Sequence, residues 1–151
     1  MKKILLFLLA FAMVFLNAPT IFATDINKTY TEYMEDGSYL IISVETIHLS
    51  KSTDTITGKK TITYKDSDGL TLWSATLKGT FSYTGSSAAC TASSITYSII
   101  DDAWKITSAT ASKSGNKAFG TVVAKRYTLG IPFKTVEKDI ALTCSADGSL
   151  S

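Results

Sequence analysis

The stretch that decides the fold is LTLWSATLKGTFSY, residues 70–83. One face of this stretch carries the large side chains Trp73, Leu77 and Phe81, together with Thr71, Ala75 and Tyr83. The opposite face carries Leu70, Leu72, Ser74, Thr76, Lys78 and Thr80. A period of two is typical of a half-buried β-strand, and Gly79 marks a point where the strand could bend or divide. We therefore expect an all-β fold.

Further segments repeat this period more loosely, at residues 39–48, 95–99, 104–106, 117–127 and 133–144. In addition, KTYTEYMEDG (28–37) aligns without gaps on KTITYKDSDG (60–69), and each ends in an Asp-Gly pair typical of hairpin turns. The pattern predicts about eight strands. We expect an antiparallel β-sandwich of immunoglobulin-like or related topology, with a small barrel as the alternative.

The first 23 residues predict a secretory signal peptide. Lys2 and Lys3 precede an apolar run at residues 4–16, which as a helix would cover only about 20 Å of a hydrocarbon core of roughly 30 Å. We expect cleavage after Ala23, although an uncleaved anchor is the alternative. The expected product is one secreted, extracellular domain of residues 24–151, with no cysteine near the cut for lipid attachment.

The charge balance argues against nucleic acid as a partner. The chain has 15 Lys and Arg against 13 Asp and Glu, and removing Lys2 and Lys3 leaves 13 of each. Only short basic doublets remain, Lys59-Lys60 and Lys125-Arg126, which we interpret as solvated strand ends. Contact with a membrane is expected only through the signal peptide before cleavage.

Cys90 and Cys144 are the only cysteines. In an exported chain they predict an intramolecular disulfide, with free thiols or intermolecular bonds as the alternatives. Such a bond would close a loop of 144 minus 90, or 54 residues, and would stabilise the fold by about 4 kcal/mol. A catalytic thiol is not expected, because there is no CxxC motif and only one histidine, His48.

No motif in the chain predicts catalysis, a metal or a cofactor. The acidic segment at residues 66–69 lacks the flanking ligands of a calcium loop, and His48 has no second histidine to share a zinc ion. Carboxylates such as Asp101, Asp102 and Glu137 stand in no distinctive arrangement. We therefore do not expect an enzyme, although a small hydrolase whose acids meet only in the folded protein remains an alternative.

Exposed aromatic rings are the most plausible binding feature in the sequence. Trp104, Tyr30 and Tyr33 are the candidate residues for a glycan, cell-wall or protein surface, whereas Trp73 is expected in the core. The favoured function is thus that of a binding or surface-associated module. A structural subunit that assembles through its strand edges is a further alternative.

The carboxyl-terminal half carries GTFSYTGSS (79–87), Cys90-Thr91, WKITS (104–108), ASKSGN (111–116), KRY (125–127) and LTCSA (142–146). In these segments the chain resembles an uncharacterised family of small secreted proteins from Gram-positive bacteria. The resemblance implies a shared fold and a shared cysteine pair, and it implies no activity.

Overall fold

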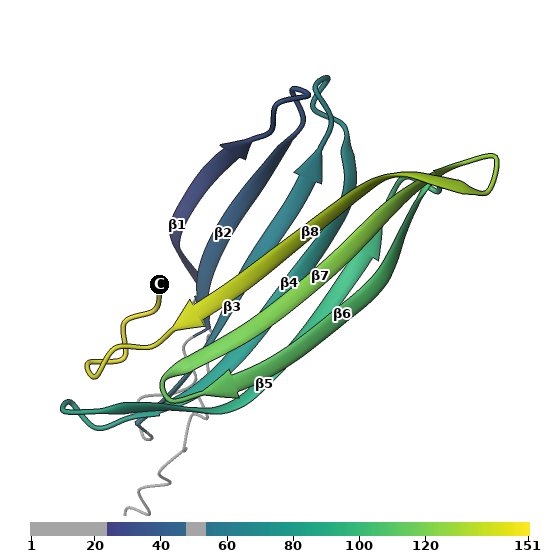
Figure 1. The fold of residues 1–151 in the computed structure, drawn as a ribbon. Coiled ribbons are helices and arrows are strands. Elements are labelled where there is room, and N and C mark those ends of the chain that lie inside the picture. Colours follow the sequence, from purple (N-terminus) through teal and green to yellow (C-terminus); the bar gives the residue numbers. More distant parts are fainter. Residues whose placement is uncertain (1–23, 48–53) are drawn as a thin grey trace, which may run out of the picture.

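The computed structural model describes residues 24–47 and 54–151 (Figure 1). The described residues form eight β-strands and no helix. The predicted signal peptide at residues 1–23 and the single histidine, His48, lie outside the described residues.

Eight strands form two antiparallel sheets that lie face to face (Figure 1). The first sheet has five strands: β1 (Thr24–Tyr33), β2 (Tyr39–Ile47), β3 (Thr55–Lys65), β4 (Thr71–Tyr83) and β5 (Ala88–Ile99). The second has three strands: β6 (Trp104–Ser114), β7 (Lys117–Thr128) and β8 (Ile131–Thr143). The prediction of about eight strands in an all-β fold is confirmed.

The strand order is a meander within each sheet, β1-β2-β3-β4-β5 and β6-β7-β8. Immunoglobulin-like sandwiches instead contain Greek-key connections, in which strands distant in sequence become neighbours. The described strands contain no such connection, so the expected immunoglobulin-like order is wrong. Within each sheet, neighbouring strands are consecutive along the chain, and the chain changes sheet once, between β5 and β6.

The repeated Asp-Gly segments form the same hairpin twice, as predicted. Gly37 turns β1 into β2 with φ of 81°, and Gly69 turns β3 into β4 with φ of 86°. The amide of Gly37 donates to the Met34 carbonyl and that of Gly69 to the Asp66 carbonyl, each at 3.1 Å. A residue with a Cβ adopts this backbone conformation at a cost, which explains the glycine at both positions.

The core lies between the two sheets and centres on β4. The predicted inward face of β4 is confirmed, since Trp73, Ala75, Leu77 and Phe81 are fully buried. Gly79 does not divide the strand, and a Cβ there would lie 2.7 Å from the Phe81 ring. The three-stranded sheet closes the core with small and branched side chains, namely Ala118, Val122, Ala124, Val136, Ile140 and Leu142.

The two cysteines are buried free thiols in the structure, so the predicted disulfide is absent. Cys90 lies in β5 of one sheet, whereas Cys144 follows β8 of the other, and the backbone of each is hydrogen-bonded to the β6–β7 turn. The Cys90 amide donates to Gly115 and the Cys144 amide to Asn116. Each thiol donates instead to a nearby carbonyl, that of Ala92 or Ser145. Burial raises the pKa of both thiols.

The end of the chain covers part of the free edge of β8. Thr143 and Ser151 exchange backbone hydrogen bonds of 2.8 and 3.0 Å. Leu150 is buried against Gly58, where a Cβ would lie 2.2 Å from the leucine side chain. The part of β8 that precedes Thr143 is left facing β1 across an open side of the sandwich, and this side holds the candidate site.

Candidate functional site

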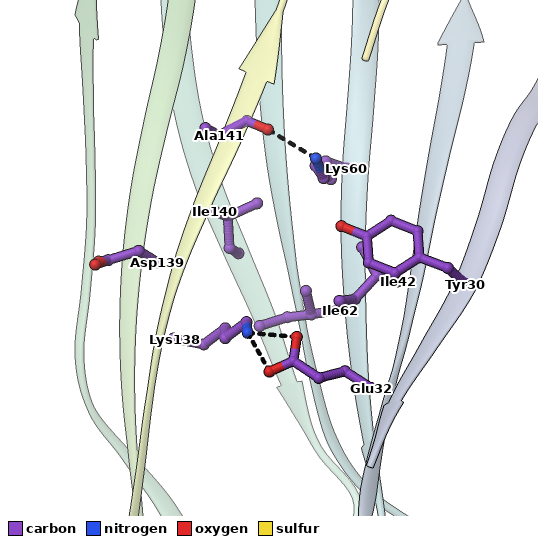
Figure 2. A pocket seen from close by; sticks show the side chains of 9 residues that line it. All are labelled: Tyr30, Glu32, Ile42, Lys60, Ile62, Lys138, Asp139, Ile140 and Ala141. Carbon is purple, nitrogen blue, oxygen red and sulfur yellow. Dashed lines mark hydrogen bonds and ion pairs between the residues drawn. The ribbon is translucent and has the colours of Figure 1, made fainter. Parts of the chain in front are cut away.

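A groove of about 190 Å³ lies between the free edge of β8 and the inner face of β1 to β3. Figure 2 shows its side chains and the two contacts that cross it. The lining residues are Tyr30, Glu32, Ile42, Lys60, Ile62, Lys138, Asp139, Ile140 and Ala141. The groove exists because the five-stranded sheet extends past the three-stranded sheet on this side.

Strand register places the groove residues in rows across the inner face of the five-stranded sheet. Tyr30 pairs with Ile42, which pairs with Ile62, so an aromatic ring stands beside two isoleucines. In the next row, Lys28 pairs with Val44 and Val44 with Lys60. Polar residues therefore occupy inward positions at the margin, where the opposite sheet no longer excludes water.

Lys138 and Glu32 bridge the groove near one end. The Lys138 ammonium lies 2.6 Å from each oxygen of the Glu32 carboxylate, and so joins β8 to β1 (Figure 2). Both side chains are partly exposed, at 25% and 47%. Ion pairs of this exposure contribute about 1 kcal/mol or less to stability. The pair therefore links β1 and β8 but contributes little to stability.

Lys60 is the most unusual group in the groove. Its ammonium donates one hydrogen bond of 2.9 Å, to the Ala141 carbonyl at the edge of β8 (Figure 2). Among the described residues it has no carboxylate partner. Burial lowers the pKa of Lys60, and the positive charge of Lys28 lowers it further. The groove thus contains a half-buried cation whose surroundings disfavour its charge.

The acidic side chains of the groove are already bonded. Both oxygens of Glu32 accept from Lys138, and Asp139 accepts from the Thr121 hydroxyl at 2.7 Å. Figure 2 shows Asp139 pointing away from Glu32. Facing carboxyl groups of the kind used by glycoside hydrolases are not present among these lining residues. No group of three or more potential metal ligands occurs in the described part of the chain.

A second groove of about 420 Å³ follows the same strand toward the β1–β2 turn. Two of its lining residues, Asp36 and Lys134, belong to a hydrogen-bond network in which Lys134 donates to Asp36 and, at 2.6 Å, to the buried Tyr64 hydroxyl. Tyr64 donates to Ser38 at 2.8 Å, and Ser38 donates to Asp36. Bonds from Lys134 and Ser38 lower the pKa of Asp36 to about 2. Here the chain supplies the counterion for its own partly buried cation.

The three candidate aromatic residues are not brought together. Tyr30 lines the groove and is 48% exposed. Tyr33 is 75% exposed and its ring lies 5.5 Å from that of Tyr39. Trp104 is only 2% exposed and packs in the core against Tyr64, at 5.2 Å between ring centroids. An exposed Trp104 was therefore the wrong expectation, because the ring fills the core beneath the three-stranded sheet.

Sequence reasoning missed the lysines of the groove. Lys60 belongs to a doublet interpreted as a solvated strand end, yet it lies on the inner face. A signal was present, because successive residues on a strand point to opposite faces, so one lysine of a doublet within a strand must point inward. Lys134 and Lys138 gave the same signal, because in β8 they share a face with the apolar residues Val136 and Ile140, two positions apart.

No helix of the described residues is long and apolar enough to cross a membrane. No family model, curated protein or solved structure matches this chain.

Proposed function

We propose that this protein is an exported binding module that holds an anionic glycan in the groove between β1 and β8. The observation that carries the proposal is Lys60, a half-buried ammonium with Lys28 nearby and no carboxylate partner among the described residues. An anion beside Lys60 would favour the charged form of the amine and offset the cost of its burial. The export of the chain follows from the predicted leader.

Tyr30 supports a sugar as the carrier of that anion. Its half-exposed ring stands beside the groove and offers a flat apolar surface with a hydroxyl at its edge. Sugar rings pack on such surfaces, while Lys138 and Glu32 offer a donor and acceptors for hydroxyl groups. The groove of about 190 Å³ is smaller than the roughly 300 Å³ of sites that enclose a whole small molecule. One acidic unit of a longer polysaccharide suits it.

Binding to a set of polysaccharides tests the proposal. The purified protein is titrated with a polyuronate, a polyol phosphate polymer and a neutral glucan, and affinity is measured by calorimetry. We expect affinity for one or both acidic polymers and none for the neutral one. Lys60→Met should weaken binding about tenfold or more, since it removes a charged hydrogen bond. Tyr30→Ala should weaken it as well, through loss of the apolar surface.

Lys59→Met is the matched control. Lys59 neighbours Lys60 on β3 but pairs with Glu45 on the outer face, so the substitution removes the same charge outside the groove. We expect it to change affinity less than about twofold. Equal losses for the two variants would mean that net charge alone drives binding, and binding of the neutral glucan alone would overturn the anionic site.

A further inference from the structure

The tip of the β7–β8 hairpin has an unusual backbone. β7 ends at Thr128 and β8 begins at Ile131, so only Leu129 and Gly130 form the turn. Both have positive φ, 50° for Leu129 and 81° for Gly130, as in a type I′ turn. Asparagine, aspartate or glycine is the usual first residue of such a turn. Leu129 is the only residue other than glycine with positive φ in the described part of the chain.

Leu129 is strained without being packed against the rest of the chain. Its side chain is 97% exposed, and two further apolar residues of the same tip, Ile131 and Phe133, are 68% and 57% exposed. A Cβ built on Gly130 would have no neighbour within 4 Å. Figure 1 shows this hairpin, in yellow-green, reaching out beyond the neighbouring strands. A strained turn that presents apolar side chains to solvent indicates a contact outside the chain.

Basic and aromatic side chains surround the base of the tip. The Lys105 ammonium lies 5.0 Å from the centre of the Tyr127 ring, and the Arg126 guanidinium lies 5.3 Å from that of Phe133. Lys105 pairs with Lys125 across β6 and β7. The segment from Ala103 to Val136 contains no Asp or Glu, but Asp101 and Asp102 directly precede it, in the β5–β6 turn whose Ala103 carbonyl accepts from the Tyr127 amide at 2.7 Å. The tip is therefore apolar at its end, and at its base three basic side chains outnumber the two carboxylates of the β5–β6 turn.

We propose that the β7–β8 tip inserts into the interface of an anionic lipid bilayer. Leu129, Ile131 and Phe133 would enter the boundary between headgroups and acyl chains, while Lys105, Lys125 and Arg126 would contact lipid phosphates. Tyr127 has the amphipathic ring that is enriched at this depth of a membrane. The basic side chains at the base of the tip favour an anionic bilayer over an apolar pocket of another protein, because such a pocket would not require them.

This surface is distinct from the groove that contains Lys60, so the two proposals can fail separately. Lys60→Met should leave lipid binding unchanged, and the tip variants below should leave polysaccharide binding unchanged. A loss of lipid binding by Lys60→Met, or of polysaccharide binding by the tip variants, would show which surface has been misassigned.

Sedimentation with lipid vesicles tests the proposal on the full chain. Vesicles of phosphatidylcholine mixed with phosphatidylglycerol are compared with vesicles of phosphatidylcholine alone. We expect tighter binding to the mixed vesicles. The double variant Leu129→Asn with Ile131→Thr should bind them more than about tenfold less tightly, since two apolar anchors are lost. All variants carry the same N-terminal segment, so the difference between them reports on the hairpin.

Two comparisons keep the test independent of folding. Leu129→Asn creates the Asn-Gly pair preferred in this turn, so the thermal midpoint of the double variant should not fall. Leu70→Asn removes another exposed leucine, 64% exposed beside the β3–β4 turn, and should leave vesicle binding unchanged.

Arg126→Gln tests the contact with lipid phosphates. It should weaken binding to the mixed vesicles about fivefold and leave binding to phosphatidylcholine alone unchanged. Absence of vesicle binding, or equal binding by the wild type and the double variant, would overturn the proposal.

Discussion

Lys134 and Lys60 both project into the open side of the sandwich, but among the described residues only Lys134, and not Lys60, meets a carboxylate. Lys134 reaches from β8 to Asp36 in the β1–β2 turn and also donates to the buried Tyr64 hydroxyl. Lys60 reaches the other way, from β3 to β8, and in the part of the chain that the structure describes it bonds to the Ala141 carbonyl alone. The two partly buried lysines thus differ in their described partners: Lys134 has a carboxylate, and Lys60 has a backbone carbonyl.

The difference separates a structural lysine from a candidate binding residue. Burial lowers the pKa of Lys134, but its bonds to Asp36 and Tyr64 outweigh that effect and the pKa is raised. For Lys60 burial acts without such compensation, and the pKa is lowered. A partly buried cation that the chain leaves without a counterion is a group that an external anion can satisfy.

The largest expected effect is on stability when Lys134 is replaced. Lys134→Met should lower the free energy of unfolding by about 2 kcal/mol, because it leaves Asp36 without its cation and the buried Tyr64 hydroxyl with one bond fewer. Urea denaturation monitored by tryptophan fluorescence measures the change. A loss below about 0.5 kcal/mol, the range of ordinary surface substitutions, would show that Lys134 stabilises the fold no more than Lys60 does.

A smaller effect concerns pH. The pKa of Asp36 is about 2 in the folded protein, below its ordinary 3.8, because Lys134 and Ser38 hydrogen-bond the carboxylate. A lowered folded pKa adds stability that is present above the unfolded pKa and is lost as pH falls through the folded one. The contribution should therefore disappear between about pH 4 and pH 2. Because Asp36 is half exposed, we expect about 1 kcal/mol or less after screening by solvent.

Asp36→Asn isolates this contribution. The variant should be less stable than the wild type at neutral pH, and the gap between the two should close on acidification toward about pH 2. A gap that stays constant with pH would show that Asp36 acts through shape or hydrogen bonding alone, without its charge.

The smallest expected effect is on stability when Lys60 is replaced. Lys60→Met should leave the free energy of unfolding within about 0.5 kcal/mol of the wild type or raise it, since the lost bond to Ala141 is offset by removal of a half-buried charge. The same urea titration measures this. If Lys60→Met destabilised the protein as strongly as Lys134→Met, Lys60 would belong to the scaffold.

Much of the fold could be predicted from alternation and turn residues. The inward face of β4 and the paired Asp-Gly hairpins follow from local chemistry, and the structure has both. Strand order could not be predicted in this way, because the period of a strand does not say which neighbour it pairs with. The meander, the burial of Trp104 and the free thiols of Cys90 and Cys144 all depend on that order.

The site could be predicted only in part. Tyr30 was selected as an aromatic residue and lies at the groove. The lysines were not selected, because a sequence does not reveal where a five-stranded sheet extends past a three-stranded one. At such a margin the opposite sheet no longer covers an inward position, and a lysine there lines the groove.

The most direct test of the binding site is the pKa of the Lys60 ammonium, measured by nuclear magnetic resonance with and without a uronic-acid oligosaccharide. Without ligand, we predict a pKa below that of an ordinary lysine, because of burial and Lys28. With ligand, the carboxylate should raise the pKa of Lys60 and leave that of Lys134 unchanged, since Lys134 already has Asp36. An unchanged pKa at Lys60 in the presence of saturating acidic oligosaccharide would contradict the assignment.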